Sequence, residues 1–263
     1  MPADSSPYSE LSGKRAFVTG GAHGIGSAIV QRLLDDKVNV VVVDVDQPGE
    51  LGGGLPCLEY VRGDVSVRAD IKVGVDRAVE RFGGVDIVVA VAGIGSLRPL
   101  LEIDDALWQR TIDVNLTGVF LAVQEGARAM VGAGRRGAIV VVSSTNAVYA
   151  EESTVHYTAS KGALVALVRA ASLDLARYGI RINAVAPGMV RTRMSAPLTE
   201  DATASAEFLA TVPLARFAEP EEIAAVARFL VSDDSSYVTG SLVVADGGLT
   251  VGMTLGTDEI GGA

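Results

Sequence analysis

Short runs of Val, Ile and Ala alternate along this 263-residue chain with longer segments whose apolar residues recur at helical spacing. Most of the short runs are continuous apolar stretches, which is typical of strands buried on both faces of a parallel sheet. Strands that alternate with helices imply right-handed crossovers and a doubly wound α/β sheet in three layers. The predicted strands span residues 15–19, 38–45, 58–65, 85–93, 138–144, 180–188 and 241–248. The predicted helices span residues 25–36, 68–82, 112–131, 155–178 and 221–231.

The alternation runs through the chain without an internal repeat or a low-complexity linker, so we predict a single domain over residues 12–248. An N-terminal extension over residues 1–11 precedes this domain, and a C-terminal tail over residues 249–263 follows it. Residues 191–214 carry no strand pattern after the sixth strand. Loops of that size are usually lids or disordered segments. We therefore expect a substrate loop at about residues 189–214.

Composition excludes several classes of protein. The chain is 49% hydrophobic and 21% charged, as globular proteins with a full core are. Its 22 basic and 32 acidic residues leave a formal charge of −10, which disfavours nucleic-acid partners. The single cysteine, Cys57, fits a reducing compartment. Because there is no apolar run of ~20 residues and no secretory signal, we expect a cytoplasmic protein without membrane partners.

A glycine-rich turn, TGGAHGIG at residues 19–26, directly follows the first predicted strand and leads into the first helix. Glycines let the backbone approach a pyrophosphate, and a helix N-terminus supplies N–H donors and a partial positive charge. The turn therefore indicates a dinucleotide site, although its G-x-x-x-G-x-G spacing differs from the G-x-G-x-x-G of other dinucleotide folds. The predicted cofactor contacts here are Gly20, His23, Gly24, Ile25 and Gly26.

The second predicted strand brings Asp44 to its end, 18 residues beyond Gly26. A carboxylate at this place accepts the ribose hydroxyls of adenosine and repels a 2′-phosphate. Two charges about 5 Å apart at an effective dielectric near 20 interact by roughly 3 kcal/mol, which is enough to decide cofactor choice. His23, where an NADP enzyme often places a cation, is mostly neutral at pH 7. We therefore predict NAD, with Asp64 and Val65 as candidates for the adenine edge.

Tyr157 and Lys161 are one helical turn apart in the predicted helix 155–178, so their side chains share one face. A lysine about 5 Å from a phenol favours the phenolate by roughly 3 kcal/mol, and an oxidised nicotinamide adds to the effect. We therefore expect Tyr157 to act as a general base. The alternative is an incidental pair on a solvated helix face. Ser144 can donate a hydrogen bond to a substrate oxygen, and Asn115 can hold a water that passes a proton from Lys161.

As an ordered set, these motifs resemble the short-chain dehydrogenase/reductase family from about residue 12 to residue 248. The resemblance implies a Rossmann-like fold and hydride transfer between nicotinamide C4 and the carbon of a secondary alcohol or ketone. The matching parts in chain order are TGGAHGIG, Asp44, Asp64 with Val65, Ala92 with Gly93, Asn115, Ser144, YTASK at 157–161, Pro187 and Gly188 with Thr192, and the closing VTGSLVVADGG.

The resemblance also implies a role for each site residue. Asn115, Ser144, Tyr157 and Lys161 would form a catalytic tetrad, in which Tyr157 exchanges the hydroxyl proton. The cofactor would lie against Ala92, Gly93, Pro187 and Gly188, with Tyr157 and Lys161 at the nicotinamide ribose and Val190 and Thr192 at the carboxamide. A homotetramer or homodimer would form through the helices that contain Asn115 and Tyr157.

The chain departs from the family pattern after the fourth strand, where the usual NNAG is Ala90-Val91-Ala92-Gly93. The family's asparagines mainly tie the middle of the sheet together, so the replacement puts that bonding in doubt more than the chemistry.

The two histidines, His23 and His156, lie far apart in the sequence, so we predict no metal site. Glu151 and Glu152 follow Ser144 in a loop, where a carboxylate either binds a polyol hydroxyl or is solvated.

We predict an NAD-dependent oxidoreductase that interconverts a secondary alcohol and a ketone, or a hemiacetal and a lactone. Sugars, cyclic alcohols, steroids and dihydrodiols are the candidate substrates. An NADPH-linked 3-ketoacyl reductase is an alternative that Asp44 disfavours. A non-catalytic NAD-sensing scaffold is a second alternative, disfavoured because all four tetrad members are present.

Overall fold

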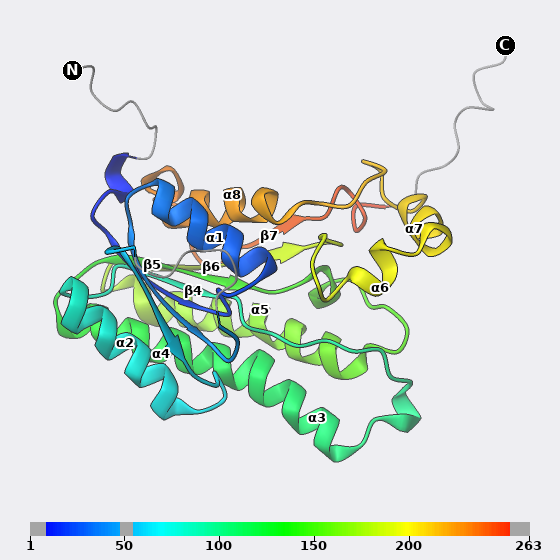
Figure 1. The fold of residues 1–263 in the computed structure, drawn as a ribbon, viewed down its shortest axis with the longest axis horizontal. Coiled ribbons are helices and arrows are strands. Elements are labelled where there is room, and N and C mark those ends of the chain that lie inside the picture. Colours follow the sequence, from blue (N-terminus) through cyan, green and yellow to red (C-terminus); the bar gives the residue numbers. More distant parts are fainter. Residues whose placement is uncertain (1–8, 48–54, 253–263) are drawn as a thin grey trace, which may run out of the picture.

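Seven parallel strands form one sheet in the order β3-β2-β1-β4-β5-β6-β7 (Figure 1). This is a computed structural model, which describes residues 9–47 and 55–252. The strand order confirms the predicted doubly wound sheet. It also reverses between β1 and β4, and ligands bind such sheets at the carboxyl ends of the strands beside that reversal. The strands are β1 (Arg15–Thr19), β2 (Asn39–Asp44), β3 (Leu58–Arg62), β4 (Ile87–Ala90), β5 (Gly137–Val142), β6 (Ile180–Pro187) and β7 (Leu242–Ala245).

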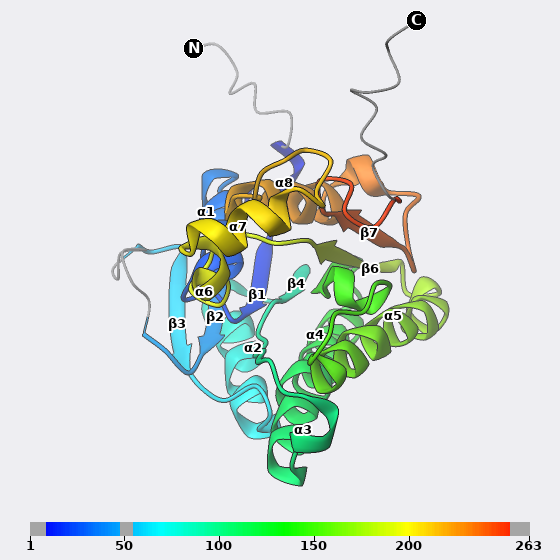
Figure 2. The same ribbon diagram turned by 90° about the vertical axis from the view of Figure 1, so that its right-hand side faces the viewer.

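Helices cover both faces of the sheet (Figures 1 and 2). One face carries α1 (Gly24–Asp35) and α8 (Pro220–Val231), and the other carries α2 (Arg68–Phe82), α4 (Val119–Gly132) and α5 (Val155–Ala176). The side chains of β2 alternate between two hydrophobic clusters, with Val41 and Val43 in one and Val40 and Val42 in the other. This two-sided burial explains why the strands read as continuous apolar runs.

The predicted start of the third helix at residue 112 is wrong. The helical backbone begins with α3 (Asp105–Ile112), continues through a π-helical segment over Asp113–Gly118, and runs on as α4. Asp104 caps α3 by accepting a hydrogen bond from the Leu107 amide at 2.7 Å. The sequence pattern did not indicate α3, because its 8 residues are too few to establish a helical periodicity. Asn115 therefore lies inside a long helix, not near its start.

The stretch after β6 contains two short helices, α6 (Ala196–Thr199) and α7 (Ala202–Leu209), rather than an irregular loop alone. Several predicted strands also extend past the observed ones, because apolar residues continue beyond the sheet edge where the backbone turns away.

Most of the predicted N-terminal extension and C-terminal tail lies outside the described residues. Among the described helices, none combines the length and the apolarity that a membrane span needs. Short 3-10 turns occur at Ser9–Leu11, Leu100–Glu102, Thr145–Ala147 and Asp233–Ser235.

Candidate active site

The glycine-rich turn between β1 and α1 is packed so closely that side chains do not fit in it. A Cβ on Gly26 would lie 1.9 Å from the carbonyl oxygen of Gly20, and a Cβ on Gly20 would lie 2.5 Å from the Ala92 amide nitrogen. Gly20 also has a φ of +73°, which favours glycine. The turn thus brings the N-terminus of α1 to the carboxyl edge of the sheet, where backbone amides can face an anion.

Asp44 lies at the end of β2, beside this turn. Its carboxylate accepts hydrogen bonds from the backbone amides of Ala22 at 2.9 Å and Asp46 at 3.0 Å. No Lys or Arg in the described part of the chain forms an ion pair with it. Burial, followed by the charge of Asp44, raises the pKa of the Tyr60 phenol to about 12. An uncompensated negative charge therefore faces the place where an adenosine ribose would lie.

A second carboxylate, Asp46, contacts both a guanidinium group and an imidazole ring. Its Oδ2 lies 2.8 Å from a guanidinium nitrogen of Arg193 and 3.4 Å from Nε2 of His23. The hydrogen bond from Arg193 is the largest influence on the pKa of Asp46, which is lowered. Because Arg193 follows β6 and Asp46 follows β2, this ion pair links the substrate loop to the end of β2, and His23 adds a contact from the glycine-rich turn.

Asp64 and Val65 follow β3, as predicted, but the Asp64 carboxylate is already engaged. Its oxygens accept from the amide and hydroxyl of Ser66 at 2.9 and 2.7 Å, and from Arg110 at 3.1 Å. Burial raises the pKa of Asp64, but these bonds outweigh it and the pKa is lowered. Val65 packs against Gly118, whose Cβ would lie 2.8 Å from its side chain.

Asn115 is fully buried in the π-helical segment and faces the loop that follows β4. Its amide donates to the Ile94 carbonyl at 2.8 Å and to Ser160 Oγ at 3.1 Å, and its Oδ1 accepts from the Ile94 amide at 2.8 Å. These bonds hold the loop against α5. π-helical turns within α-helices are frequent at functional sites.

The apolar replacements of the family's asparagines leave the sheet edge bonded. The backbone amides of Val91 and Ala92 both donate to the carbonyl of Thr19 at 3.1 Å. Gly93 then passes close to two tetrad members, because a Cβ there would lie 3.3 Å from Lys161 Nζ and 3.4 Å from Asn115 Oδ1. A side chain at this position would fill the space in front of both groups.

Tyr157 and Lys161 lie one turn apart on α5, as predicted. The Lys161 ammonium is buried, lies 5.6 Å from the centre of the Tyr157 ring, and donates to the Val142 carbonyl at 3.1 Å. Burial lowers the pKa of Lys161 to about 8. Burial also raises the pKa of Tyr157, although a hydrogen bond with Ser144 opposes this. We expected Lys161 to lower the pKa of the Tyr157 phenol, but the protein's own groups raise it.

Ser144 follows β5, and its side chain has a partner, Asn146, that was not predicted from the sequence. Its hydroxyl donates to Asn146 Oδ1 at 3.2 Å, and the Asn146 backbone amide donates back to Ser144 Oγ at 3.2 Å. The Asn146 Nδ2 donates in turn to Glu151 Oε2 at 3.2 Å. The position of Asn146, two residues after the candidate catalytic serine, is the sequence feature that could have indicated this contact. Glu152 is exposed.

His156 is fully buried beside Tyr157, and its Nε2 lies 3.1 Å from Ser96 Oγ. Its Nδ1 has no hydrogen-bond partner among the described residues. Burial lowers the pKa of this imidazole, and the charge of Arg98 adds to the effect. His156 therefore packs against the loop after β4 in its neutral form.

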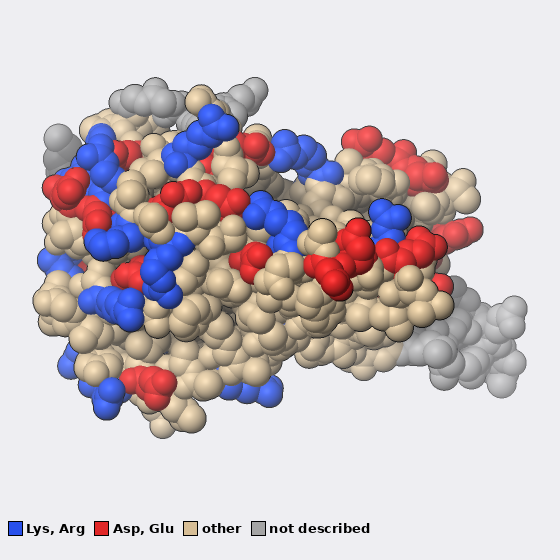
Figure 3. Space-filling view, turned by 90° about the horizontal axis from the view of Figure 1, so that it is seen from below, with Lys and Arg blue, Asp and Glu red and all other residues tan. Residues whose placement is uncertain are grey.

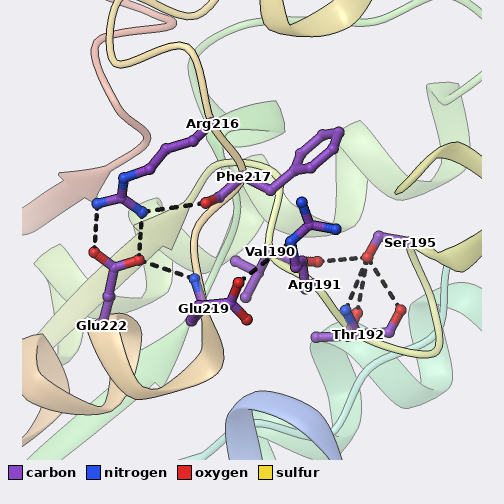
Figure 4. Close-up of polar contacts among 8 residues, drawn as sticks. All are labelled: Val190, Arg191, Thr192, Ser195, Arg216, Phe217, Glu219 and Glu222. Atoms are coloured by element: carbon purple, nitrogen blue, oxygen red, sulfur yellow. Dashed lines mark hydrogen bonds and ion pairs between the residues drawn. The ribbon is translucent and has the colours of Figure 1, made fainter. Parts of the chain in front are cut away.

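The segment after β6 crosses back over the glycine-rich turn. A Cβ on Gly24 would lie 3.1 Å from the Thr192 methyl group. Ser195 fixes this bend, because its hydroxyl bonds the Val190 carbonyl and accepts from the Thr192 amide at 3.0 Å (Figure 4). Pro187 ends β6, and Gly188 lies against Asp246, whose Cα would be 2.8 Å from a Cβ at Gly188.

Both ends of the substrate loop are joined beside α8 (Figure 4). Arg191 pairs with Glu219 at 3.2 Å and lies 5.0 Å from the centre of the Phe217 ring. Arg216 forms two 2.7 Å hydrogen bonds with Glu222, which lower the pKa of that carboxyl to about 2. Glu222 also accepts from the Glu219 amide at 2.9 Å at the start of α8. These contacts therefore hold the two ends of the substrate loop at the start of α8.

These positions fit a nicotinamide dinucleotide. The close-packed glycine turn suits a pyrophosphate, Asp44 suits a ribose diol, and the space in front of Gly93 lies beside Lys161 and Asn115. Thr192 lies against the turn beside Gly24. The sequence-predicted residues thus converge at one edge of the sheet.

Comparison with known proteins agrees with this geometry. A family model described as enoyl-(acyl carrier protein) reductase matches residues 20–250. The 2,5-dichloro-2,5-cyclohexadiene-1,4-diol dehydrogenase of Sphingobium indicum is 38% identical over 249 residues, covering 92% of this chain and 99% of that protein. A 3-oxoacyl-(acyl carrier protein) reductase of Thermotoga maritima is 37% identical over 248 residues, covering 92% and 99%. The ligand-free aldohexose dehydrogenase of Thermoplasma acidophilum matches with a TM-score of 0.87 at 29% identity, covering 95% and 99%.

The chain therefore belongs to the short-chain dehydrogenase/reductase family. It is an oxidoreductase that acts on CH–OH groups with a nicotinamide cofactor and a small-molecule substrate. The predicted family, fold and reaction class are confirmed.

Proposed function

We propose that this protein is an NAD-dependent dehydrogenase of a cyclic secondary alcohol or of the hemiacetal carbon of a sugar. The observation that carries the proposal is the convergence of Asn115, Ser144, Tyr157 and Lys161 beside the cradle formed by Gly93 and the glycine-rich turn. The relatives that act on a cyclic diol and on aldohexoses support the substrate class.

In this proposal Tyr157 takes the hydroxyl proton and Ser144 donates a hydrogen bond to the same substrate oxygen. Lys161 holds the nicotinamide ribose, and Asn115 anchors a water that carries the proton onward. When bound, the oxidised nicotinamide supplies the hydride acceptor and a positive charge near the phenol. That charge opposes the effect of burial on Tyr157, because a nearby cation favours a phenolate.

The preference for NAD rests on Asp44, whose charge no described cation neutralises. The Arg193 guanidinium and the His23 imidazole contact Asp46 instead. A 2′-phosphate would therefore meet a carboxylate and no available guanidinium. An NADPH-linked 3-oxoacyl reductase is the second candidate, because one relative has that acyl reductase activity in its name.

We also propose that the protein assembles as a homotetramer or homodimer through α4 and α5. Leu173 on α5 is 81% exposed, and Phe120 on α4 is 40% exposed. The face seen in Figure 3 has a broad area with few charged side chains between groups of charges at its edges. Large apolar side chains that are exposed, such as Leu173 and Phe120, are typical of interaction surfaces.

The experiment that tests the function compares wild type with Tyr157→Phe. We expect the variant to bind NAD with unchanged affinity and to lose at least about a thousandfold in kcat on cyclic alcohols and aldoses, since it lacks the proton acceptor. Tyr149→Phe, at a half-exposed tyrosine nearby, is the matched control and should keep its turnover. Full activity of Tyr157→Phe would contradict the assignment of Tyr157, and NADP binding more tightly than NAD would contradict the cofactor.

A further inference from the structure

We propose that Asn146 determines specificity by binding a second hydroxyl group, on the carbon next to the one that is oxidised. The substrate would then be a vicinal diol or a sugar oxidised beside a free hydroxyl. This inference rests on the proposed function and narrows its substrate class.

The contact between Asn146 and Ser144 sets the geometry. Asn146 Oδ1 lies 3.2 Å from Ser144 Oγ. Two gauche hydroxyl oxygens on neighbouring carbons are also about one hydrogen-bond length apart. A diol can therefore place one oxygen at Ser144 and the other at Asn146. Asn146 is 6% exposed and Ser144 is 8% exposed, so both lie at a similar depth.

Three acceptors fix the orientation of the Asn146 amide. Its Nδ2 lies 3.2 Å from Glu151 Oε2, 3.4 Å from Thr154 Oγ1 and 3.5 Å from Thr158 Oγ1. The NH₂ group is thereby held on the side away from Ser144, and the carbonyl oxygen is held toward it. The Asn146 side chain therefore offers the substrate a hydrogen-bond acceptor, which a hydroxyl satisfies and a methyl ether does not.

Substrate binding changes the partner of the Ser144 proton. In the structure the Ser144 hydroxyl donates its hydrogen bond to Asn146 Oδ1. During catalysis the same hydroxyl must donate to the reacting oxygen of the substrate. A second substrate hydroxyl replaces Ser144 as the donor to Asn146 Oδ1, so each polar group keeps a partner. A mono-alcohol leaves this buried acceptor without a donor, which is costly. The Asn146 backbone amide continues to donate to Ser144 Oγ in both cases.

Charge favours a neutral substrate group at this position. Glu151 lies behind Asn146, and its charge reaches Tyr157, since it contributes to raising the pKa of that phenol. A carboxylate on the neighbouring carbon would be repelled. A hydroxyl donates to the same acceptors without that repulsion.

The test uses two matched sets of probes with NAD as the oxidant. One set is cis-1,2-cyclohexanediol, its monomethyl ether and cyclohexanol, and the other is D-glucose and 2-deoxy-D-glucose. We expect wild type to favour the probe with the adjacent hydroxyl by about tenfold to a hundredfold in kcat/KM. Asn146→Ala should bring that ratio to within about threefold of one. It keeps the backbone donor to Ser144, so a merely structural defect would lower all rates together without changing the ratio.

Glu152→Gln, at the exposed neighbour of Glu151, is the matched control and should keep the wild-type ratio. Calorimetric binding of the diol and of its ether to the NAD complex of Tyr157→Phe gives the same ratio without turnover. Equal kcat/KM for every probe in a set, or an unchanged ratio in Asn146→Ala, would overturn the proposal for Asn146 alone. A preference for 2-aminocyclohexanol over the diol would also overturn it, in favour of an ammonium site. Turnover of no probe would contradict the proposed function together with this inference.

Discussion

The Lys161 ammonium donates to the Val142 carbonyl at 3.1 Å and lies 5.6 Å from the centre of the Tyr157 ring. Helical spacing alone suggested a lysine that would make the phenol acidic. Burial instead lowers the pKa of Lys161 and raises that of Tyr157. The protein therefore holds the pKa values of both groups away from their ordinary values, in the direction that disfavours the charged form of each.

Lys161→Met should raise the free energy of unfolding at pH 7 by about 2–3 kcal/mol in the absence of coenzyme, because it removes a buried charge. The same variant should lose dehydrogenase activity. Urea titrations of wild type and variant measure the difference.

The control for this prediction is the pH dependence of the difference in unfolding free energy between wild type and Lys161→Met. The pKa of Lys161 is about 8 in the folded protein, below the ordinary 10.5, so the folded state bears the full cost of the charge below about pH 8. From pH 8 to 10.5 the unfolded chain holds this proton more tightly, so wild-type stability rises with pH relative to the variant. The gap should shrink by at least half between pH 7 and pH 10. A constant gap, or a less stable variant at pH 7, would contradict the assignment.

Asp44→Asn should reduce the preference for NAD over NADP by at least about tenfold in kcat/KM, since the repulsion of the 2′-phosphate disappears. Steady-state kinetics with both coenzymes measure this ratio. Asp35→Asn, at the exposed end of α1, is the control and should leave the ratio unchanged. An unchanged ratio in Asp44→Asn would mean that another group selects the coenzyme.

Gly26→Ala should destabilise the fold by about 2–4 kcal/mol and weaken NAD binding, because the new Cβ would lie 1.9 Å from the Gly20 carbonyl oxygen. Gly132→Ala at the end of α4, where a Cβ meets no atom within 4 Å, should be neutral or slightly stabilising. Thermal unfolding and NAD titration test both variants. Equal stability of the two variants would be inconsistent with the close packing of the turn.

Leu173→Asp should lower the molar mass in light scattering after size exclusion, because it places a charge in the proposed contact on α5. Val73→Asp on α2, an exposed apolar residue outside that contact, is the control and should leave the mass unchanged. If wild type is already a monomer, or if Leu173→Asp keeps the wild-type mass, α5 is not the assembly face.

Much of the fold followed from local patterns. The Val-rich run at β2 indicated a strand buried on both faces, and its alternate side chains do enter two different clusters. The segment of α3 was missed because its 8 residues are too few to establish a helical periodicity, and its capping Asp104 alone was too weak a signal. The same limit hid the π-helical turn at Asn115, which depends on contacts with the loop after β4.

The amino-acid sequence by itself determined the succession of the strands along the chain, most of the longer helices, the glycine turn, the acidic end of β2 and the YTASK turn of α5. Such features depend on backbone sterics and on spacing along one element, so neighbouring residues encode them. Only the tertiary structure decided that Lys161 bonds Val142, that Asn146 turns its carbonyl toward Ser144, and that Asp46 pairs with Arg193. The contacts of Lys161 and Asp46 depend on desolvation and on distances between residues far apart in the chain, which no local pattern records. The Asn146 amide is oriented by Glu151, Thr154 and Thr158 only once the segment after β5 has folded.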